Sequence, residues 1–158
     1  MGKRTALSLA ASAVLVALSS AARQKPEQPT IEELSGRVVP LSVYLQRRYG
    51  IAIDREQGDS QVVLEMEDGG AVPLLRDDRS RFFFMDRRVQ DRPVVLKVYR
   101  YKAMPYVRLL DAWTVKQGKR FRICYWCNTC AITTFTPGRC PCCQDDVELQ
   151  EVPVEGER

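Results

Sequence analysis

All six cysteines of this 158-residue chain lie in one short stretch, residues 124–143. They include two pairs in which two residues separate the cysteines, with the turn-forming Pro137-Gly138 between the pairs. A two-residue spacer lets both sulfurs of a tight turn face one point, so two such pairs can supply four thiolates to one tetrahedral metal ion. The spacing therefore predicts a four-cysteine metal site with the ligands Cys127, Cys130, Cys140 and Cys143.

Zinc is the metal that we expect in such a site, because four thiolates in a closed tetrahedron are typical of structural zinc. Iron, alone or in an iron–sulfur cluster, is an alternative that four cysteines also accommodate. A disulfide framework is a further alternative, since six cysteines in an exported chain allow 15 pairings. Two features favour ligation: the cysteines crowd one segment instead of joining distant loops, and Cys142 is adjacent to Cys143.

Cys124 and Cys142 are additional to a four-thiolate site. Each can be a buried small apolar residue, a member of a mutual disulfide or a reactive thiol, and we favour the structural roles because free cysteine is often buried. Cys124 and Cys127 are also separated by two residues. The choice of four ligands among six cysteines is therefore open from spacing alone.

The same stretch resembles two known metal modules. Tyr125-Trp126-Cys127, followed by Pro137-Gly138-Arg139-Cys140-Pro141-Cys142-Cys143 and Leu149, is similar to the small heavy-metal-binding domain of copper-transporting ATPases and efflux proteins. Thr129-Cys130 stand near the place of that module's Met-His pair, and Gln144-Asp145 replace its Gly-Met. The stretch also resembles rubredoxin-like zinc ribbons. These resemblances imply metal binding, with copper as an alternative to the all-cysteine zinc site that we expect.

The N-terminal residues 1–22 have the layout of a secretory signal peptide. Lys3 and Arg4 precede the uncharged residues 5–22, which end in the small residues Ser20-Ala21-Ala22. An uncleaved membrane anchor is the alternative, because the uncharged run is just long enough to span a bilayer. Both possibilities predict an exported domain, periplasmic or extracellular, that touches a membrane only through an uncleaved N-terminal segment.

The charge of the exported chain argues against nucleic acid as a partner. The formal net charge is +4, and loss of Lys3 and Arg4 with residues 1–22 lowers it to +2. Four thiolates with one divalent cation add about −2. The mature protein with its metal would be close to neutral, so polyanion binding has no electrostatic basis. Arginines and aspartates also alternate over residues 76–92, which predicts a solvated mixed-charge surface.

The middle of the chain reads as short strands with one helix. The helix is expected at residues 41–49, ending at Gly50, and Phe82, Phe83 and Phe84 are expected in the core. Strands are expected at residues 36–41, 61–66, 71–75, 82–85, 93–101 and 106–115. The last two resemble the closing strands of an OB-fold. The fold class predicted is mainly β, a small OB-like barrel or curled antiparallel sheet followed by a C-terminal zinc-ribbon-like knuckle.

The predicted organisation has five parts. We expect the cysteine module to pack on the β-domain, because the apolar strand around Phe121 and Ile123 runs into it without a linker. The parts are a signal peptide or anchor at 1–22, a flexible linker at 23–35, the β-domain at 36–120, the cysteine module at 121–150 and a disordered tail at 151–158.

Enzyme activity is not expected. The chain has no histidine, which excludes imidazole catalysis, and a closed four-cysteine zinc site leaves no position for a reactive water. We therefore predict an exported, non-enzymatic protein with structural zinc, whose β-domain binds an envelope protein or ligand. The alternatives are a periplasmic heavy-metal-handling protein and a thiol or rubredoxin-like redox protein.

Overall fold

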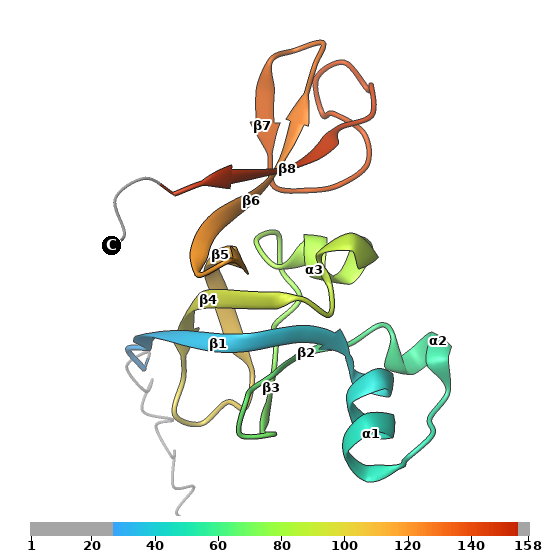
Figure 1. Ribbon diagram of the computed structural model, residues 1–158, viewed down its shortest axis with the longest axis vertical. Helices are drawn as coiled ribbons and strands as arrows, with labels where there is room; N and C mark the ends of the chain where they lie inside the picture. The colour runs from blue at the N-terminus through green and yellow to red at the C-terminus, as the bar shows by residue number, and fades with distance from the viewer. Residues whose placement is uncertain (1–26, 155–158) are drawn as a thin grey trace, which may run out of the picture.

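A computed structural model describes residues 27–154 of the chain, and the fold is mainly β (Figure 1). Eight strands form one sheet, and short helices lie in the connections. The elements are β1 (Thr30–Pro40), α1 (Leu41–Tyr49), α2 (Arg55–Gly58), β2 (Val62–Glu65), β3 (Ala71–Pro73), α3 (Arg81–Met85), the 3-10 turn η1 (Arg87–Val89), β4 (Pro93–Arg100), β5 (Val107–Lys116), β6 (Lys119–Cys127), β7 (Ile132–Thr134) and β8 (Glu148–Pro153).

The predicted signal peptide or anchor at residues 1–22 lies outside the described residues, as do residues 23–26 of the predicted linker and 155–158 of the predicted tail. None of the helices within residues 27–154 is long and apolar enough to cross a membrane.

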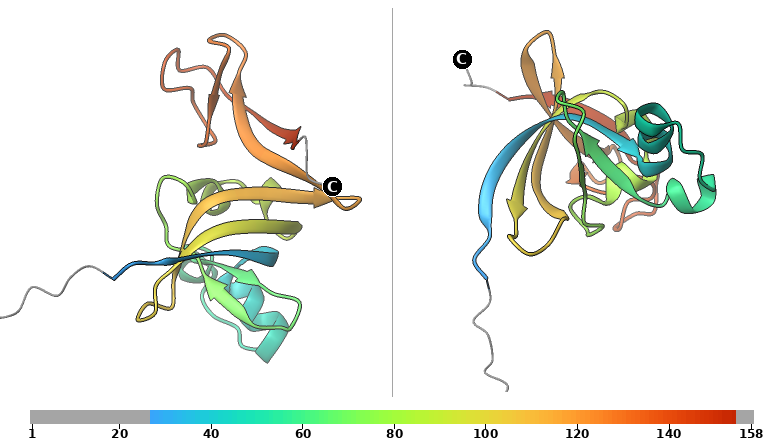
Figure 2. Two further views of the ribbon diagram at one scale, coloured as in Figure 1. Left: turned by 90° about the vertical axis from the view of Figure 1, so that its left-hand side faces the viewer. Right: turned by 90° about the horizontal axis from the view of Figure 1, so that it is seen from below.

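The sheet is antiparallel and curled, which confirms the predicted fold class. Its strand order is β3-β2-β1-β4-β5-β6-β7, and β8 pairs with β6. An isolated parallel bridge joins Leu74 to Val107, and the N–H of Leu75 donates to the carbonyl of Val107 at 2.9 Å. The end of β3 thus returns to the start of β5, and five strands curl around one core without closing into a barrel (Figure 2). This pairing scheme resembles the partly open five-stranded OB-fold.

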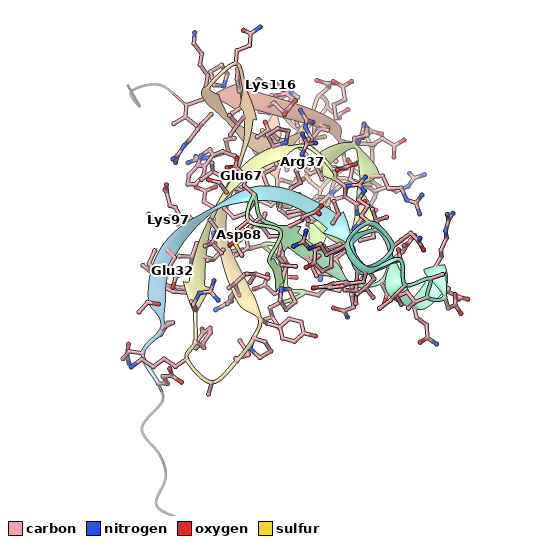
Figure 3. All side chains as sticks on the ribbon, turned by 60° about the horizontal axis from the view of Figure 1, so that its bottom comes forward. Glu32, Arg37, Glu67, Asp68, Lys97 and Lys116 are labelled. Atoms are coloured by element: carbon pink, nitrogen blue, oxygen red, sulfur yellow. The ribbon has the colours of Figure 1, made fainter. Side chains whose placement is uncertain are left out.

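The core follows from the alternation of apolar residues along the long strands. In β4, Val94, Leu96 and Val98 share the buried face that the period of two predicts, while the opposite face carries the exposed Lys97 and the buried Val95. Tyr125 and Phe83, both fully buried, are the largest side chains of the main core. Exposed charged residues, among them Arg37, Lys97 and Lys116, surround the sheet (Figure 3). Several form ion pairs, including Arg100–Glu32, Arg120–Glu33, Arg108–Asp77 and Arg81–Asp78, which gives the mixed-charge surface that the sequence predicts.

The strand expected at residues 82–85 is wrong, because this segment forms the short helix α3. Hydrogen bonds at its start favour a turn: the carboxylate of Asp77 accepts from the backbone N–H groups of Arg79 and Ser80, and the Ser80 hydroxyl donates to the carbonyl of Leu75. Four consecutive apolar residues have no period that distinguishes strand from helix. Phe82 and Phe83 are nevertheless buried in the core as predicted, and Phe84 is partly buried.

Two predicted boundaries also differ from the structure. Strand β1 begins at Thr30, so residues 30–35 belong to the sheet and not to a flexible linker. Residues 151–153 of the predicted tail belong to β8 and pair with β6. Both segments are ordered because their backbones pair with a neighbouring strand, β4 for residues 30–35 and β6 for residues 151–153. The helix at residues 41–49 is confirmed, with Gly50 in the left-handed conformation that ends it.

Glu151 of β8 fastens the C-terminal part of the chain to the sheet. Its carboxylate accepts hydrogen bonds from Arg92 at 2.8 Å, Lys116 at 2.5 Å and Thr114 at 2.5 Å, and its side chain is only 15% exposed. Burial by itself raises the pKa of Glu151, but the hydrogen bonds from Lys116 and Thr114 outweigh it and hold this pKa below its ordinary value. The ionised carboxylate therefore stabilises the fold.

We expect Glu151→Gln to lower the free energy of unfolding by about 1–2 kcal/mol at pH 7, because two cations lose their anionic partner. Since the folded pKa of Glu151 lies below the unfolded value of about 4.3, the stabilisation is fully present above that value. It is lost as the pH falls through the folded pKa. Denaturant unfolding between pH 3 and pH 7 should show the difference from wild type shrinking in acid. Glu148→Gln, an exposed change on the same strand, is the control. A constant difference across this range would contradict the assignment.

Candidate metal centre

Two loops of similar conformation carry the paired cysteines. The first joins β6 to β7, which pair with Cys127 opposite Ile132. The second is closed by a bridge between Arg139 and Asp146, which lie on either side of Cys140 and Cys143. Both loops lie at one end of the molecule, at the top of Figure 1. The β6–β7 hairpin and the bridged loop therefore present their cysteines toward each other.

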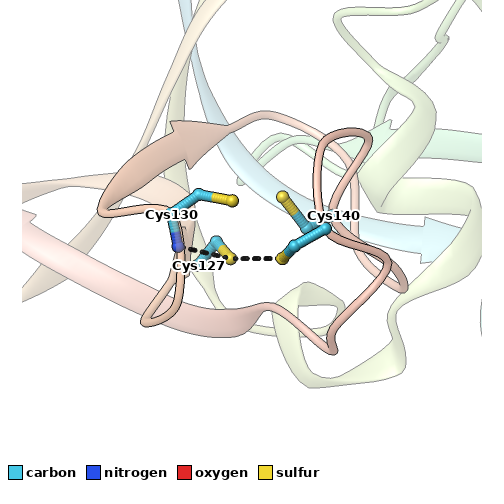
Figure 4. A group of neighbouring side chains, drawn as sticks. Cys127, Cys130 and Cys140 are labelled. Atoms are coloured by element: carbon cyan, nitrogen blue, oxygen red, sulfur yellow. Dashed lines mark hydrogen bonds between the residues drawn. The ribbon is translucent and has the colours of Figure 1, made fainter.

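The four cysteines selected by spacing are the ones that the structure brings together (Figure 4). Their Sγ atoms all lie within 4.8 Å of one another, and those of Cys127 and Cys143 are 3.4 Å apart. A zinc tetrahedron with Zn–S bonds of about 2.3 Å has sulfur–sulfur edges of about 3.8 Å. The cluster Cys127, Cys130, Cys140 and Cys143 therefore fits one tetrahedral ion with small adjustments of the side chains.

The backbone of the two loops repeats closely. Ala131 and Gln144, each one residue after the second cysteine of a pair, have φ angles of 55° and 65°. The N–H of Ala131 donates to the carbonyl of Cys127 at 2.9 Å, and the N–H of Gln144 donates to that of Cys140 at 3.0 Å. Left-handed conformation costs a non-glycine residue about 1–2 kcal/mol. Both loops adopt it at the same position, which gives the two cysteine pairs matching geometry.

Backbone N–H groups donate to the first sulfur of each pair. The N–H of Cys130 donates to the Sγ of Cys127 at 3.4 Å. Backbone hydrogen bonds from Cys143 and Cys142 lower the pKa of Cys140 from 9.0 to about 7. In contrast, side-chain hydrogen bonds with Cys143 and Cys142 raise the pKa of Cys130. Metal binding at this cluster must therefore displace protons, as it does at other thiolate sites.

The cluster is continuous with the hydrophobic core. Cys127 and Cys140 are fully buried and pack in the main core with Tyr125 and Val147, while Cys130 and Cys143 are partly buried at its edge. The hydroxyl of Thr129 donates to the carboxylate of Asp145, which joins the two loops outside the cluster. Two of the four cysteines are thus buried and two are partly accessible to solvent.

The two additional cysteines lie outside the cluster. Cys124 is buried in β6 opposite Gln150, and burial raises the pKa of its thiol. Cys142 is exposed beside Cys143. All six cysteines are free thiols in the structure. Cys124 therefore acts as a small apolar residue of the sheet, and Cys142 is accessible.

The sequence analysis did not find the contact that braces the base of the hairpin. The hydroxyl of Tyr125, a fully buried residue of β6, donates to the carboxylate of Asp86 at 3.0 Å. Asp86 also accepts from the backbone N–H and the guanidinium of Arg88, and the Arg88 side chain lowers the pKa of Asp86. The two partners are 39 residues apart, so no local spacing could have indicated the pair.

Tyr125→Phe should destabilise the protein by about 1.5–3 kcal/mol, because a hydrogen bond to a buried carboxylate is lost without changing the ring. Denaturant unfolding at pH 7 measures the change. Tyr106→Phe, at a partly buried ring in the turn before β5, is the matched control. Equal stability of the two variants would show that the Asp86 contact contributes nothing.

Cys127→Ser and Cys140→Ser should each reduce zinc affinity by more than about 100-fold. Loss of a residue that only hydrogen-bonds to a metal ligand costs about 10–100-fold, and loss of the ligand itself should cost more. Competition with a chromogenic chelator measures it. Cys124→Ala and Cys142→Ser are the controls, and they should leave the stoichiometry and the affinity within a few-fold of wild type. Loss of binding in either control, with Cys127→Ser unaffected, would move the ligand set to other cysteines.

Comparison with known proteins does not add to this geometry. No protein-family model, no curated protein and no solved structure matches the chain. The resemblance to heavy-metal-binding and rubredoxin-like modules is therefore confined to the cysteine spacing of residues 125–149. What the structure shows at this centre is a cluster of four close cysteines that could hold a metal ion.

Proposed function

We propose that the protein is an exported, non-enzymatic zinc protein. Cys127, Cys130, Cys140 and Cys143 hold one zinc ion, and the β-domain binds another protein or a ligand of the cell envelope. The convergence of four Sγ atoms within 4.8 Å of one another is the observation that carries this proposal. The layout of residues 1–22 is the basis for export.

Zinc in this site has a structural role. Four thiolates complete the tetrahedron and leave no position for a water or a substrate. Apparent zinc affinity in small modules corresponds to about 10–16 kcal/mol, and a typical domain is stable by about 5–15 kcal/mol. Metal binding is therefore large enough to determine whether the cysteine loops fold, because they have little regular structure beyond the short strand β7.

Heavy-metal handling is the second candidate, and the exposed Cys142 favours it. This thiol is adjacent to Cys143 and accessible from solvent, so it could take up a metal from one of the four ligands during exchange. A handling protein would release its metal to a competing chelator within minutes and would accept copper as well as zinc. A rubredoxin-like redox protein would instead hold iron and show a visible absorption band.

The experiment is a metal and thiol inventory of the native protein. The full-length chain is expressed in a host with a periplasm and isolated from the periplasmic and membrane fractions, and its N-terminus is determined. Elemental mass spectrometry and a thiol count after denaturation are made on one sample. One zinc with at least four reduced thiols supports the proposal. A metal-free protein without free thiols indicates disulfides and removes every metal-based function.

Removal of zinc should unfold the cysteine loops first. We expect a strong chelator to abolish amide-exchange protection over residues 124–146, because the two loops are joined chiefly through the metal. Amide-exchange protection in β1 and β4 should decrease less, because these two strands pair continuously from Thr30 opposite Arg100 to Arg37 opposite Pro93. Hydrogen exchange with mass spectrometry measures both regions in the same sample. Unchanged protection of residues 124–146 after complete metal removal would refute the structural role of the ion.

A further inference from the structure

The helices α1 and α2 form an excursion between β1 and β2 that projects from the sheet, at the opposite end of the molecule from the cysteine loops (Figure 1). A cleft of about 550 Å³ lies between this excursion and the segment around η1. We call it the helical cleft and define it by its apolar residues Val39, Val43 and Ile53 and its arginines Arg47, Arg55 and Arg87. Its volume is in the range of small-molecule sites, which is about 300–1,000 Å³.

One wall of the helical cleft is apolar. Val39 is fully buried beneath it and forms a small core with Tyr44 and Val63. Val43 packs against this small core, and Ile53 is 37% exposed. A ligand that removes this apolar surface from water gains about 25 cal/mol of binding free energy for each Å² covered. This wall is suited to a short apolar group.

The other walls carry three guanidinium groups. Asp91 holds Arg47 through two hydrogen bonds of 3.0 and 2.7 Å, and Asp59 pairs with Arg87 at 3.2 Å. Arg55 forms no ion pair with any residue between 27 and 154. Three cations and two paired carboxylates leave the lining with a net positive charge. Guanidinium groups with spare N–H donors recognise oxyanions, so this charge is complementary to a phosphate or carboxylate.

The carboxylate that positions Arg47 is held in an unusual backbone conformation. Asp91 has a φ angle of 52°, which is uncommon for a residue with a side chain. The conformation persists because the N–H of Asp91 donates to the carbonyl of Val38 at 2.8 Å and its own carbonyl accepts from Arg37 at 2.9 Å. Strain of this kind is retained where the surrounding structure fixes it, often at binding sites. The Asp91 carboxylate is thereby placed where it accepts both hydrogen bonds from Arg47.

We propose that the helical cleft binds a small amphipathic anion. The oxyanion head, a phosphate or a carboxylate, contacts Arg55 and Arg87, and a short apolar body covers Val43 and Ile53. This inference rests on the part of the proposed function that gives the β-domain a ligand, and it states the chemical class of that ligand. It is independent of zinc, because the cleft and the cysteine loops lie at opposite ends of the molecule.

Isothermal titration of the full chain tests the proposal with benzyl phosphate and hexanoate as amphipathic probes. Inorganic phosphate and benzyl alcohol are the half-probes, and vesicles with anionic lipids test a membrane surface. We expect saturable one-to-one binding of at least one amphipathic probe, with both half-probes at least about tenfold weaker. Arg55→Gln and Arg87→Gln should each weaken the amphipathic probe by about tenfold or more.

Two further variants locate the binding. Ile53→Ser should weaken the amphipathic probe while leaving any weak binding of inorganic phosphate unchanged. Arg108→Gln, which removes a comparable arginine–aspartate pair on β5, should have no effect. Thermal unfolding and the zinc content are measured for every sample, so that loss of the metal centre is seen separately from loss of ligand binding.

Absence of saturable binding to the folded wild-type chain would overturn the proposal. Equal affinity for inorganic phosphate and benzyl phosphate, binding of vesicles alone, or unchanged affinity in both arginine variants would overturn it as well. If the probe binds and the sample holds no zinc, the helical cleft stands and the metal proposal falls. If zinc is present and no probe binds, the reverse holds.

Discussion

The convergence of four cysteines is the constraint around which the loops of residues 128–147 are arranged. Residues 128–147 contain one short strand and few large apolar side chains, so their backbone has little to hold it in place. Cys127 and Cys140 nevertheless pack in the main core, continuous with Tyr125 and Val147. The cysteine cluster is thus an extension of the β-domain core, and the zinc proposed for it would stabilise loops that hydrophobic burial alone does not.

Carboxylates that accept several hydrogen bonds fix the junctions between the parts of the fold. Glu151 attaches β8 to the sheet, Asp86 braces the base of the β6–β7 hairpin, and Asp91 orients Arg47 beside the helical cleft. Exposed ion pairs contribute little to stability, but Glu151 and Asp86 are largely buried and accept several hydrogen bonds each. The contacts of Tyr125 with Asp86 and of Arg92 with Glu151 join residues 39 and 59 positions apart, so they determine tertiary arrangement more than secondary structure.

The two proposed sites lie at opposite ends of the curled sheet and have different chemistry. The cysteine loops offer a closed set of soft thiolate ligands, which suits a structural metal and leaves no room for a substrate. The helical cleft offers guanidinium groups beside an apolar wall, which suits a small amphipathic anion. A protein with both can keep its fold through the metal and reserve the other end for recognition.

The sequence by itself predicted two cysteine pairs with metal-ligand spacing, because a two-residue spacer is a local property of the chain. The tertiary structure selected Cys127, Cys130, Cys140 and Cys143 among the six cysteines, because only the folded loops bring these four Sγ atoms together. The sequence also determined the helix ended by Gly50 and the alternating face of β4, since periodicity and a left-handed glycine act locally. Only the tertiary structure decided that residues 82–85 form a helix and that residues 30–35 form a strand. In those segments the local pattern is ambiguous, and neighbouring strands or buried partners select the conformation. The Tyr125–Asp86 contact and the helical cleft likewise join residues distant in sequence, so packing alone creates them.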